Sequence, residues 1–213
     1  MFSHAVIIAG GFGARMMPLT KYVPKPLVEV NGKPLIQYAL DFFKKHKIES
    51  ITVTYGHKHH LLLDYVGSDV ASMINTIDKD NAYFLFNTIV KYIDKPIIVC
   101  PCDLIIDIDM EQLYQEYIQL GEPALCIVPI PASANADFIH SKESRVTKIT
   151  REDISEVCAS GIQILNPAKI NRTIIPKDNF YDVWMELIKA EAMYITKTQP
   201  ISWKAFDNLK DII

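Results

Sequence analysis

The chain has 213 residues, of which 49% are hydrophobic and 22% are charged, proportions that are ordinary for a folded globular protein. A domain of this size buries roughly 70% of its unfolded surface and needs no disulfide bonds for stability. The net charge of −3 excludes a long-range attraction to nucleic acid, so any phosphate binding must depend on a few placed cations.

The first residues and the cysteines indicate the compartment. The start of the chain has no basic segment and too short an apolar run for a signal peptide, and no stretch approaches the length that spans a membrane. No CxxC pair occurs, and strand alternation would place the thiols of Cys100 and Cys102 on one face. We expect a cytoplasmic protein with no membrane partner, in which four cysteines are buried and reduced: Cys100, Cys102, Cys126 and Cys158.

Apolar β-type runs alternate with helical patterns in the first half of the chain. The strands predicted there are 5–9, 51–54 and 97–100, and the predicted helices begin at Pro34, run through 61–65, and cover 83–92 and 110–120. In the second half, the sequence predicts strands at 124–130, 160–165 and 201–206, a helix at 180–190 and a polar loop within 133–156. Apolar strands that alternate with helices indicate a parallel sheet covered on both faces.

A glycine-rich loop, Gly10-Gly11-Phe12-Gly13-Ala14-Arg15, follows the first predicted strand. Ligands of open α/β sheets bind beyond the carboxyl ends of the strands, where this loop is expected. Glycines allow backbone N–H groups to approach a polyphosphate closely, and Arg15 adds a planar cation suited to phosphate oxygens. The spacing fits neither the dinucleotide fingerprint nor the P-loop, and the double glycine alone would also suit a plain tight turn.

The residues around this loop indicate a protein family more specifically than the loop itself does. The run from Val6 to Leu40, VIIAGGFGARMMPLTKYVPKPLVEVNGKPLIQYAL, closely resembles the signature of the sugar-phosphate nucleotidylyltransferase superfamily. That signature is an apolar strand, a GGxGTR-type loop, PLT, PKPL, and GKP before a helix. Ala14 is a departure, since threonine or serine is usual there. The resemblance implies a Rossmann-like, glycosyltransferase-A-like α/β fold, a three-layer sandwich with a mixed, mostly parallel sheet.

The same resemblance implies one domain over 1–213, with an NTP-binding half at about 1–110 and an acceptor half at about 111–213. It casts Arg15 and Lys25 as the catalytic cations that hold the triphosphate. Pro24 and Pro26 restrict the backbone on either side of Lys25, so this lysine is pre-positioned. The residues expected to bind the NTP are Ala9, Gly10, Gly11, Gly13 and Asn81.

Two carboxylates are candidates for the Mg²⁺ that an NTP requires, and Mg²⁺ usually takes only one or two protein carboxylates. Asp103 follows a buried strand and resembles the metal-binding aspartate of the family, although it could instead cap a turn. The segment Trp203–Asp207 resembles the WxDxD of the family, but Ala205 stands at the first acidic position. We therefore expect Asp207 to be the second ligand, with a helix cap as the alternative.

The acceptor side carries weaker signals. Gly161 lies in an SGI…NP segment like that of the family, and Asp182 resembles a family acidic position, although it could simply favour a helix N-terminus. Arg151 stands where sugar-using members have a lysine, and Thr150 replaces the preceding glutamate, so Arg151 either binds the acceptor phosphate or is an exposed loop arginine. Arg151, Gly161 and Asp182 are the predicted acceptor-binding residues. Many sugar-using members have a glycine-rich segment for the base and sugar where this chain has Asp80–Leu85, which contains no glycine. Asn81, in this segment, resembles an asparagine of the phosphocholine cytidylyltransferases, or caps a helix.

The sequence thus predicts a Mg²⁺-dependent nucleotidylyltransferase that joins a nucleoside monophosphate from an NTP to a phosphorylated small molecule, a sugar-1-phosphate or a non-sugar phosphate. Its product would be an activated precursor for surface glycans. The alternatives are a CTP-dependent enzyme acting on a phosphocholine-like acceptor and a catalytically inactive nucleotide-binding homologue. Asp107-Ile108-Asp109 has the spacing of a glycosyltransferase metal motif, but a glycosyltransferase would not account for the PKPL motif. We expect a monomer or homodimer with no nucleic-acid partner.

Overall fold

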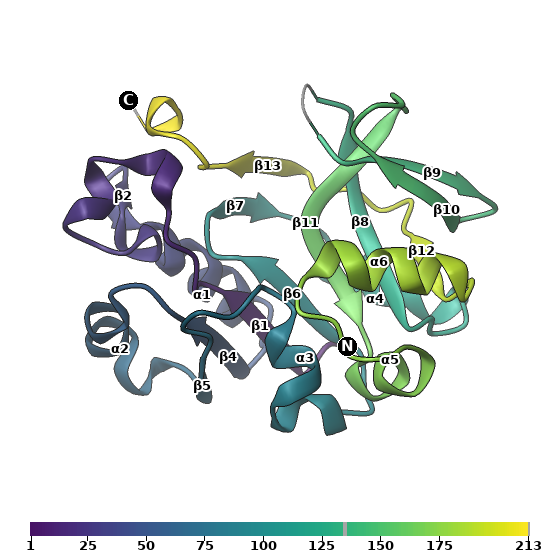
Figure 1. Cartoon of the computed structure of the whole chain (residues 1–213), viewed down its shortest axis with the longest axis horizontal. Coiled ribbons are helices and arrows are strands. Elements are labelled where there is room, and N and C mark those ends of the chain that lie inside the picture. Colours follow the sequence, from purple (N-terminus) through teal and green to yellow (C-terminus); the bar gives the residue numbers. More distant parts are fainter. Residues whose placement is uncertain (134–135, 213) are drawn as a thin grey trace.

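The computed structural model describes residues 1–133 and 136–212 (Figure 1). The strands are β1 (His4–Ile8), β2 (Glu29–Val30), β3 (Lys33–Pro34), β4 (Ser50–Tyr55), β5 (Ser72–Asn75), β6 (Ile97–Pro101), β7 (Leu104–Asp107), β8 (Leu125–Pro131), β9 (Phe138–Lys142), β10 (Arg145–Thr150), β11 (Val157–Leu165), β12 (Met193–Ile195) and β13 (Ser202–Ala205). The helices are α1 (Leu35–Lys45), α2 (His59–Val66), α3 (Tyr83–Asn87), α4 (Met110–Gln119), α5 (Pro167–Thr173) and α6 (Phe180–Lys189). Short 3₁₀ turns lie at Ala14–Met16, Leu19–Lys21, Lys25–Leu27, Gly67–Asp69, Ile89–Tyr92 and Leu209–Asp211.

Nine strands of the described chain form one sheet in the order β5-β4-β1-β6-β11-β8-β12-β10-β9. Strands β5, β4, β1 and β6 are parallel, so their carboxyl ends meet at one edge of the sheet. Strand β11 runs antiparallel to both β6 and β8, whereas β12 is parallel to β8. The predicted α/β class with a mixed sheet is confirmed, and parallel pairing dominates the half of the sheet that the first half of the chain supplies.

Helices cover both faces of this sheet. Successive side chains of a strand point to opposite faces, and in β1 the buried Ala5 and Ile7 pack with residues of α1, α2 and α4. Val6, between them, packs with residues of α3, α5 and α6 on the other face. Burial on both faces explains why these strands are apolar throughout, and the three layers agree with the predicted sandwich.

A second, two-stranded sheet joins the last strand to the middle of the chain (Figure 1). Strand β13 pairs antiparallel with β7, with Ala205 opposite Leu104, and the Phe206 N–H donates to the Asp103 carbonyl oxygen at 3.0 Å. The side chain of Phe206 is buried in a small apolar cluster with Met16, Val28, Val30 and Leu35. The strand predicted at 201–206 is therefore confirmed, and its end is held beside the end of β6.

The loop predicted within 133–156 is wrong where the chain forms a hairpin. Residues 138–142 and 145–150 form the antiparallel strands β9 and β10, while residues 134–135 lie outside the described part. Only Val146 and Ile149 of β10 are buried. Because this strand lies near the edge of the sheet and its other residues face solvent, its composition resembles that of a loop.

The helix predicted at 83–92 is interrupted. Helix α3 ends at Asn87, and Thr88 adopts an extended conformation before the 3₁₀ turn Ile89–Tyr92. The Thr88 hydroxyl donates to the Phe84 carbonyl oxygen at 2.7 Å and accepts from the Val90 N–H at 3.2 Å. A threonine side chain that bonds local backbone groups in this way competes with helix continuation.

The four cysteines are buried and free, as predicted, and Cys100 and Cys102 pack in the same core cluster. Asp109 caps α4 by accepting the N–H groups of Glu111 and Gln112. Among the described residues, no helix combines the length and the apolar character that crossing a bilayer requires.

Candidate active site

The glycine loop after β1 rests on the segment that carries Lys25. Gly13 has a φ of +64°, and a Cβ there would lie 2.9 Å from the side chains of both Lys25 and Thr20. The Thr20 hydroxyl donates to the Gly13 carbonyl oxygen at 3.0 Å. Only glycine combines this conformation with so close a contact, so the loop and the lysine segment are fixed relative to each other.

The backbone of the loop offers donors for an anion. Within the described chain, the N–H groups of Gly11, Phe12 and Gly13 donate to no protein acceptor. The N–H of Ala9, in contrast, donates to the Thr54 hydroxyl at 3.0 Å, and the Gly10 carbonyl oxygen accepts from His57 N–H at 3.4 Å. Consecutive free N–H groups of this kind form an anion-binding concavity.

Four charged side chains, which we call the charge cluster, meet beside this loop: Arg15, Lys25, Asp103 and Asp207. The Lys25 ammonium contacts the Asp103 carboxylate and lies 3.0 Å from Asp207 Oδ1, and an Arg15 guanidinium nitrogen lies 3.1 Å from the same oxygen. The side chains of Lys25 and Asp103 are each only 13% exposed. Burial opposes the charged form of Lys25, but the two carboxylates outweigh burial and raise the pKa of this lysine.

The fold explains how residues so far apart in sequence meet. Lys25 opens a 3₁₀ turn between the buried Pro24 and Pro26. Asp103 lies between β6 and β7, and the β13–β7 pairing places Asp207 next to it. The alternative in which Asp207 caps a helix does not hold, because Asn208 occupies the cap position of the turn Leu209–Asp211.

The two carboxylates suit a divalent cation. Both contact one nitrogen atom, that of Lys25, so their oxygens converge on a common point. Although the described residues contain no group of three potential ligands, Mg²⁺ commonly binds one or two carboxylates together with phosphate oxygens. Asp103 and Asp207 therefore fit the predicted metal set.

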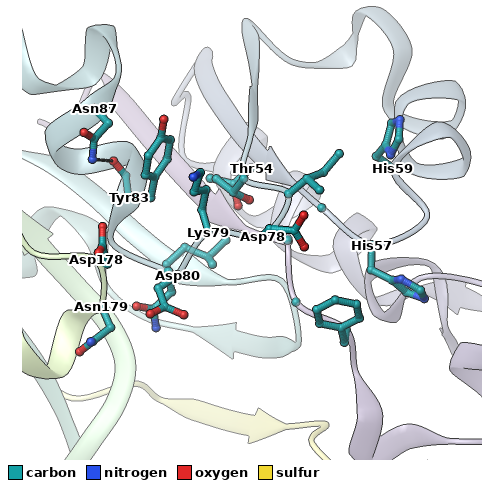
Figure 2. A pocket seen from close by; sticks show the side chains of 18 of the residues that line it. Thr54, His57, His59, Asp78, Lys79, Asp80, Tyr83, Asn87, Asp178 and Asn179 are labelled. Atoms are coloured by element: carbon teal, nitrogen blue, oxygen red, sulfur yellow. Dashed lines mark hydrogen bonds between the residues drawn. The ribbon is translucent and has the colours of Figure 1, made fainter.

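A pocket of about 970 Å³ opens at the carboxyl ends of β1, β4 and β5, beside the glycine loop (Figure 2). Its volume suits a small ligand of nucleotide size. Most of its polar lining was not predicted from the sequence, in part because β5 was not predicted. The residues missed include Thr54, His57, His59, Asp78, Lys79, Asp80, Tyr83, Asn87, Asp178 and Asn179.

Asn81 lines this pocket but does not cap α3, whose cap position is Ala82 and has no side-chain bond. The cap alternative is therefore wrong. Instead, Asn81 Oδ1 accepts the N–H of Phe180 at 2.9 Å. The side chain thus joins the pocket to the first residue of α6.

The three predicted acceptor residues lie on different elements: Arg151 after β10, Gly161 on β11 and Asp182 on α6. Gly161 has a φ of +90°, and a Cβ there would lie 3.2 Å from the side chain of Pro101 and 3.6 Å from that of Leu104. Arg151 is 72% exposed and binds Asp137 with its Nε at 2.7 Å. Asp182 lies in the first turn of α6, exposed to solvent. In the described chain, no ion pair joins Arg151 or Asp182 to the charge cluster.

A mixed α/β sheet with free loop amides, fixed cations and paired carboxylates at its carboxyl edge is typical of proteins that bind a polyphosphate with a metal. Residues 4–150 match the profile of the family described as nucleotidyl transferase. This match covers more than half of the chain, and the chain therefore belongs to the nucleotidyl transferase family.

Individual relatives agree with the family. A Bacillus subtilis protein provisionally named UTP–glucose-1-phosphate uridylyltransferase is 35% identical over 85 residues, which are 40% of this chain and 31% of that protein. The 2-aminoethylphosphonate cytidylyltransferase of Lancefieldella rimae is 32% identical over 108 residues, 49% of this chain and 44% of that enzyme. The chain thus spans less than half the length of either relative.

A solved structure shows the same fold. The inositol-1-phosphate CTP transferase of T. maritima superposes with a TM-score of 0.78 at 16% sequence identity, covering 100% of this chain and 92% of that one. At this level of identity, the comparison concerns the fold alone.

Proposed function

We propose that this protein is a Mg²⁺-dependent nucleotidylyltransferase that transfers a nucleoside monophosphate from an NTP to a phosphorylated small molecule and releases pyrophosphate. The observation that carries the proposal is the charge cluster, in which two cations and two carboxylates meet beside the free loop amides. The adjoining pocket has room for a nucleoside. The product would be an activated precursor for surface glycans, made in the cytoplasm.

Each part of the site has a role in this proposal. The pocket binds the nucleoside, and Asn81, which follows β5 in the chain, contacts it there. The N–H groups of the glycine loop, with Arg15 and Lys25, bind the triphosphate. Asp103 and Asp207 would hold Mg²⁺, which supplies positive charge to the phosphate oxygens.

The chemistry requires no general base. The acceptor phosphate has a second pKa of about 6, so it is largely dianionic at pH 7. One of its oxygens forms a bond to the α-phosphorus while the bond from that phosphorus to the β-bridging oxygen breaks, and pyrophosphate leaves with those electrons. Because an anion attacks a polyanion, the main barrier is electrostatic. Arg15 and Lys25 lower it by offsetting the charge and fixing the line of attack.

The test is pyrophosphate release from a panel of NTPs and acceptor phosphates, with and without Mg²⁺. Arg15→Ala should reduce turnover by about 100-fold or more, the scale of losing one positioned transition-state contact. Arg172→Ala is the matched control, because Arg172 also pairs with a carboxylate, that of Asp94, but outside the charge cluster. Turnover of Arg15→Ala equal to that of the control would refute the assignment.

A second candidate is a CTP-dependent enzyme with a phosphocholine-like acceptor. The segment Asp80–Leu85 contains no glycine, although sugar-using members resembling this chain have one there, and Thr150 replaces their glutamate. Arg151 is bound to Asp137 in the acceptor half. The relative from L. rimae is named for cytidylyl transfer to a non-sugar acceptor, which also supports CTP and a non-sugar acceptor for this chain. A preference for CTP with phosphocholine over hexose-1-phosphates would select this candidate.

The inactive-homologue alternative depended on Ala205. Because Asp207 reaches the Lys25 ammonium that Asp103 also contacts, a second carboxylate is in place despite Ala205, which supports an active enzyme. Nucleotide binding without pyrophosphate release by any pair in the panel would favour the inactive homologue.

A further inference from the structure

The side chain of Asn81 has two ends with different surroundings. Its oxygen accepts the Phe180 N–H at 2.9 Å, and an N–H can only donate, so the oxygen is the atom that faces α6. Within the described chain, the amide nitrogen of Asn81 has no protein partner, and the residue lines the pocket. One end is thus committed to α6, and the other is available to a ligand.

The backbone strengthens the same junction. The Ala82 N–H donates to the Asp178 carbonyl oxygen at 2.9 Å. Figure 2 shows Asp80 beside Asp178 and Asn179, residues from opposite halves of the chain that line the same pocket. Asn179 in turn caps α6, because its Oδ1 accepts the Asp182 N–H at 2.9 Å. The start of α6 is therefore part of the pocket wall.

Helix α6 also contacts the elements that carry the three predicted acceptor residues. Asp182 lies on the helix, and the helix packs on β10, which Arg151 directly follows. The buried Trp184 donates its indole N–H to Gln163 Oε1 at 2.8 Å, two residues from Gly161 on β11. Helix α6 thus carries one predicted acceptor residue and contacts the strands beside the other two.

We propose that Asn81 is a positioning residue that couples nucleotide binding to the acceptor site, by holding the start of α6 through its amide oxygen while its amide nitrogen binds the nucleotide. This inference rests on the proposed function. It predicts that a nucleotide in the pocket immobilises Asn81 and, through it, the helix that orders the acceptor residues. The NTP therefore improves acceptor binding without contacting Arg151 or Asp182.

The test separates the two ends of the side chain. Asn81→Asp keeps an oxygen for the Phe180 N–H but loses the amide donor, whereas Asn81→Ala loses both. Both variants should raise the KM for the NTP. Asn81→Ala should also raise the KM for the acceptor, by roughly 3- to 10-fold, the scale of one lost hydrogen bond. Asn81→Asp should raise it less, because the bond to the Phe180 N–H remains although the contact to the nucleotide is lost. Rescue of the acceptor KM by aspartate distinguishes positioning from a general structural defect.

The matched control is Asn171→Ala. Asn171 also bridges two segments, since its amide donates to the Leu85 and Pro167 carbonyl oxygens at 3.0 and 2.8 Å. It does not line the pocket. Asn171→Ala should change neither the KM for the NTP nor the KM for the acceptor, even though it loses two hydrogen bonds on the face of the sheet that α6 also covers.

Hydrogen exchange gives a readout that needs no turnover. In the wild type, the NTP should slow exchange of the Phe180 amide, and in Asn81→Ala it should not. An unchanged acceptor KM in Asn81→Ala, or equal acceptor KM values in both Asn81 variants, would overturn the coupling while leaving the proposed function intact. If instead the wild type releases no pyrophosphate with any NTP and acceptor, the proposed function fails, and the coupling fails with it.

Discussion

Lys25 pairs with two carboxylates, those of Asp103 and Asp207, and replacing it with methionine removes the charge while keeping most of the side-chain length. Loss of one partner of a buried ion pair costs about 3–5 kcal/mol. Because Lys25 and Asp103 retain 13% exposure each, we expect the lower end, about 3 kcal/mol of unfolding free energy. The more exposed pairing with Asp207 adds at most about 1 kcal/mol. For a chain of this length, a loss of 3 kcal/mol lowers the Tm by about 6–12 °C.

The same variant should gain affinity for Mg²⁺ in the absence of nucleotide, because the ammonium no longer competes for Asp103 and Asp207. Mg²⁺ at 100 times its Kd would restore about 2.7 kcal/mol. Thermal and urea unfolding with and without Mg²⁺ measure both effects. Lys44→Met is the control, since its pair with Asp69 is exposed on both sides and should contribute at most about 1 kcal/mol. A Tm loss no larger than that of the control, or no Mg²⁺ rescue, would refute the reasoning.

Three further outcomes are expected. Asp207→Asn should lower turnover by about 100-fold or more and raise the Mg²⁺ concentration for half-maximal rate, and an unchanged Mg²⁺ titration would remove Asp207 from the metal set. Gly161→Ala should lower the unfolding free energy by about 1–3 kcal/mol in urea titrations, because its φ is +90° and its Cβ would press on Pro101; equal stability would show that the backbone there relaxes. Burial lowers the pKa of His4 and, as the largest cause, that of His46. The unfolded chain therefore takes up these protons first, and stability that is complete above the ordinary pKa of 6.5 should fall as the pH drops below it. His4→Gln should reduce this dependence, and an identical pH profile would contradict it.

The parts of the fold that sequence predicts well are those buried on both faces. Strands β1, β4 and β6 are continuous apolar runs. Short runs of this kind, bounded by turn residues, are typical of strands that are buried on both faces. Strand β10 was missed because most of its residues face solvent, so its pattern lacks an apolar signature. The break at Thr88 depends on which backbone groups its hydroxyl meets, which local composition does not encode.

The candidate site divides in the same way. The cations and carboxylates could be placed from the resemblance because the motif fixes Arg15 and Lys25, and the strand ends fix the carboxylates. Most of the residues that line the pocket could not be placed from the sequence. They lie on β5 and on the loop before α6, and only the folded topology brings that loop near Asn81. The partner of the Asn81 amide, Phe180, is 99 positions away in sequence, and no periodicity reports such a contact.

Asp207 lies two residues beyond the end of a short two-stranded ribbon, β13–β7, and this placement affects how the candidate site responds to heat. Two-stranded ribbons are marginal by themselves, and β13 pairs only with β7 in the described chain. Phe206 shares its apolar cluster with Met16, the neighbour of Arg15, so detachment of β13 and Phe206 loosens the loop that carries Arg15 as well. Such local opening requires less free energy than global unfolding. Heat should therefore separate Asp207 from Asp103 while the nine-stranded sheet is still intact, so that the candidate site opens at a lower temperature than the sheet that carries it.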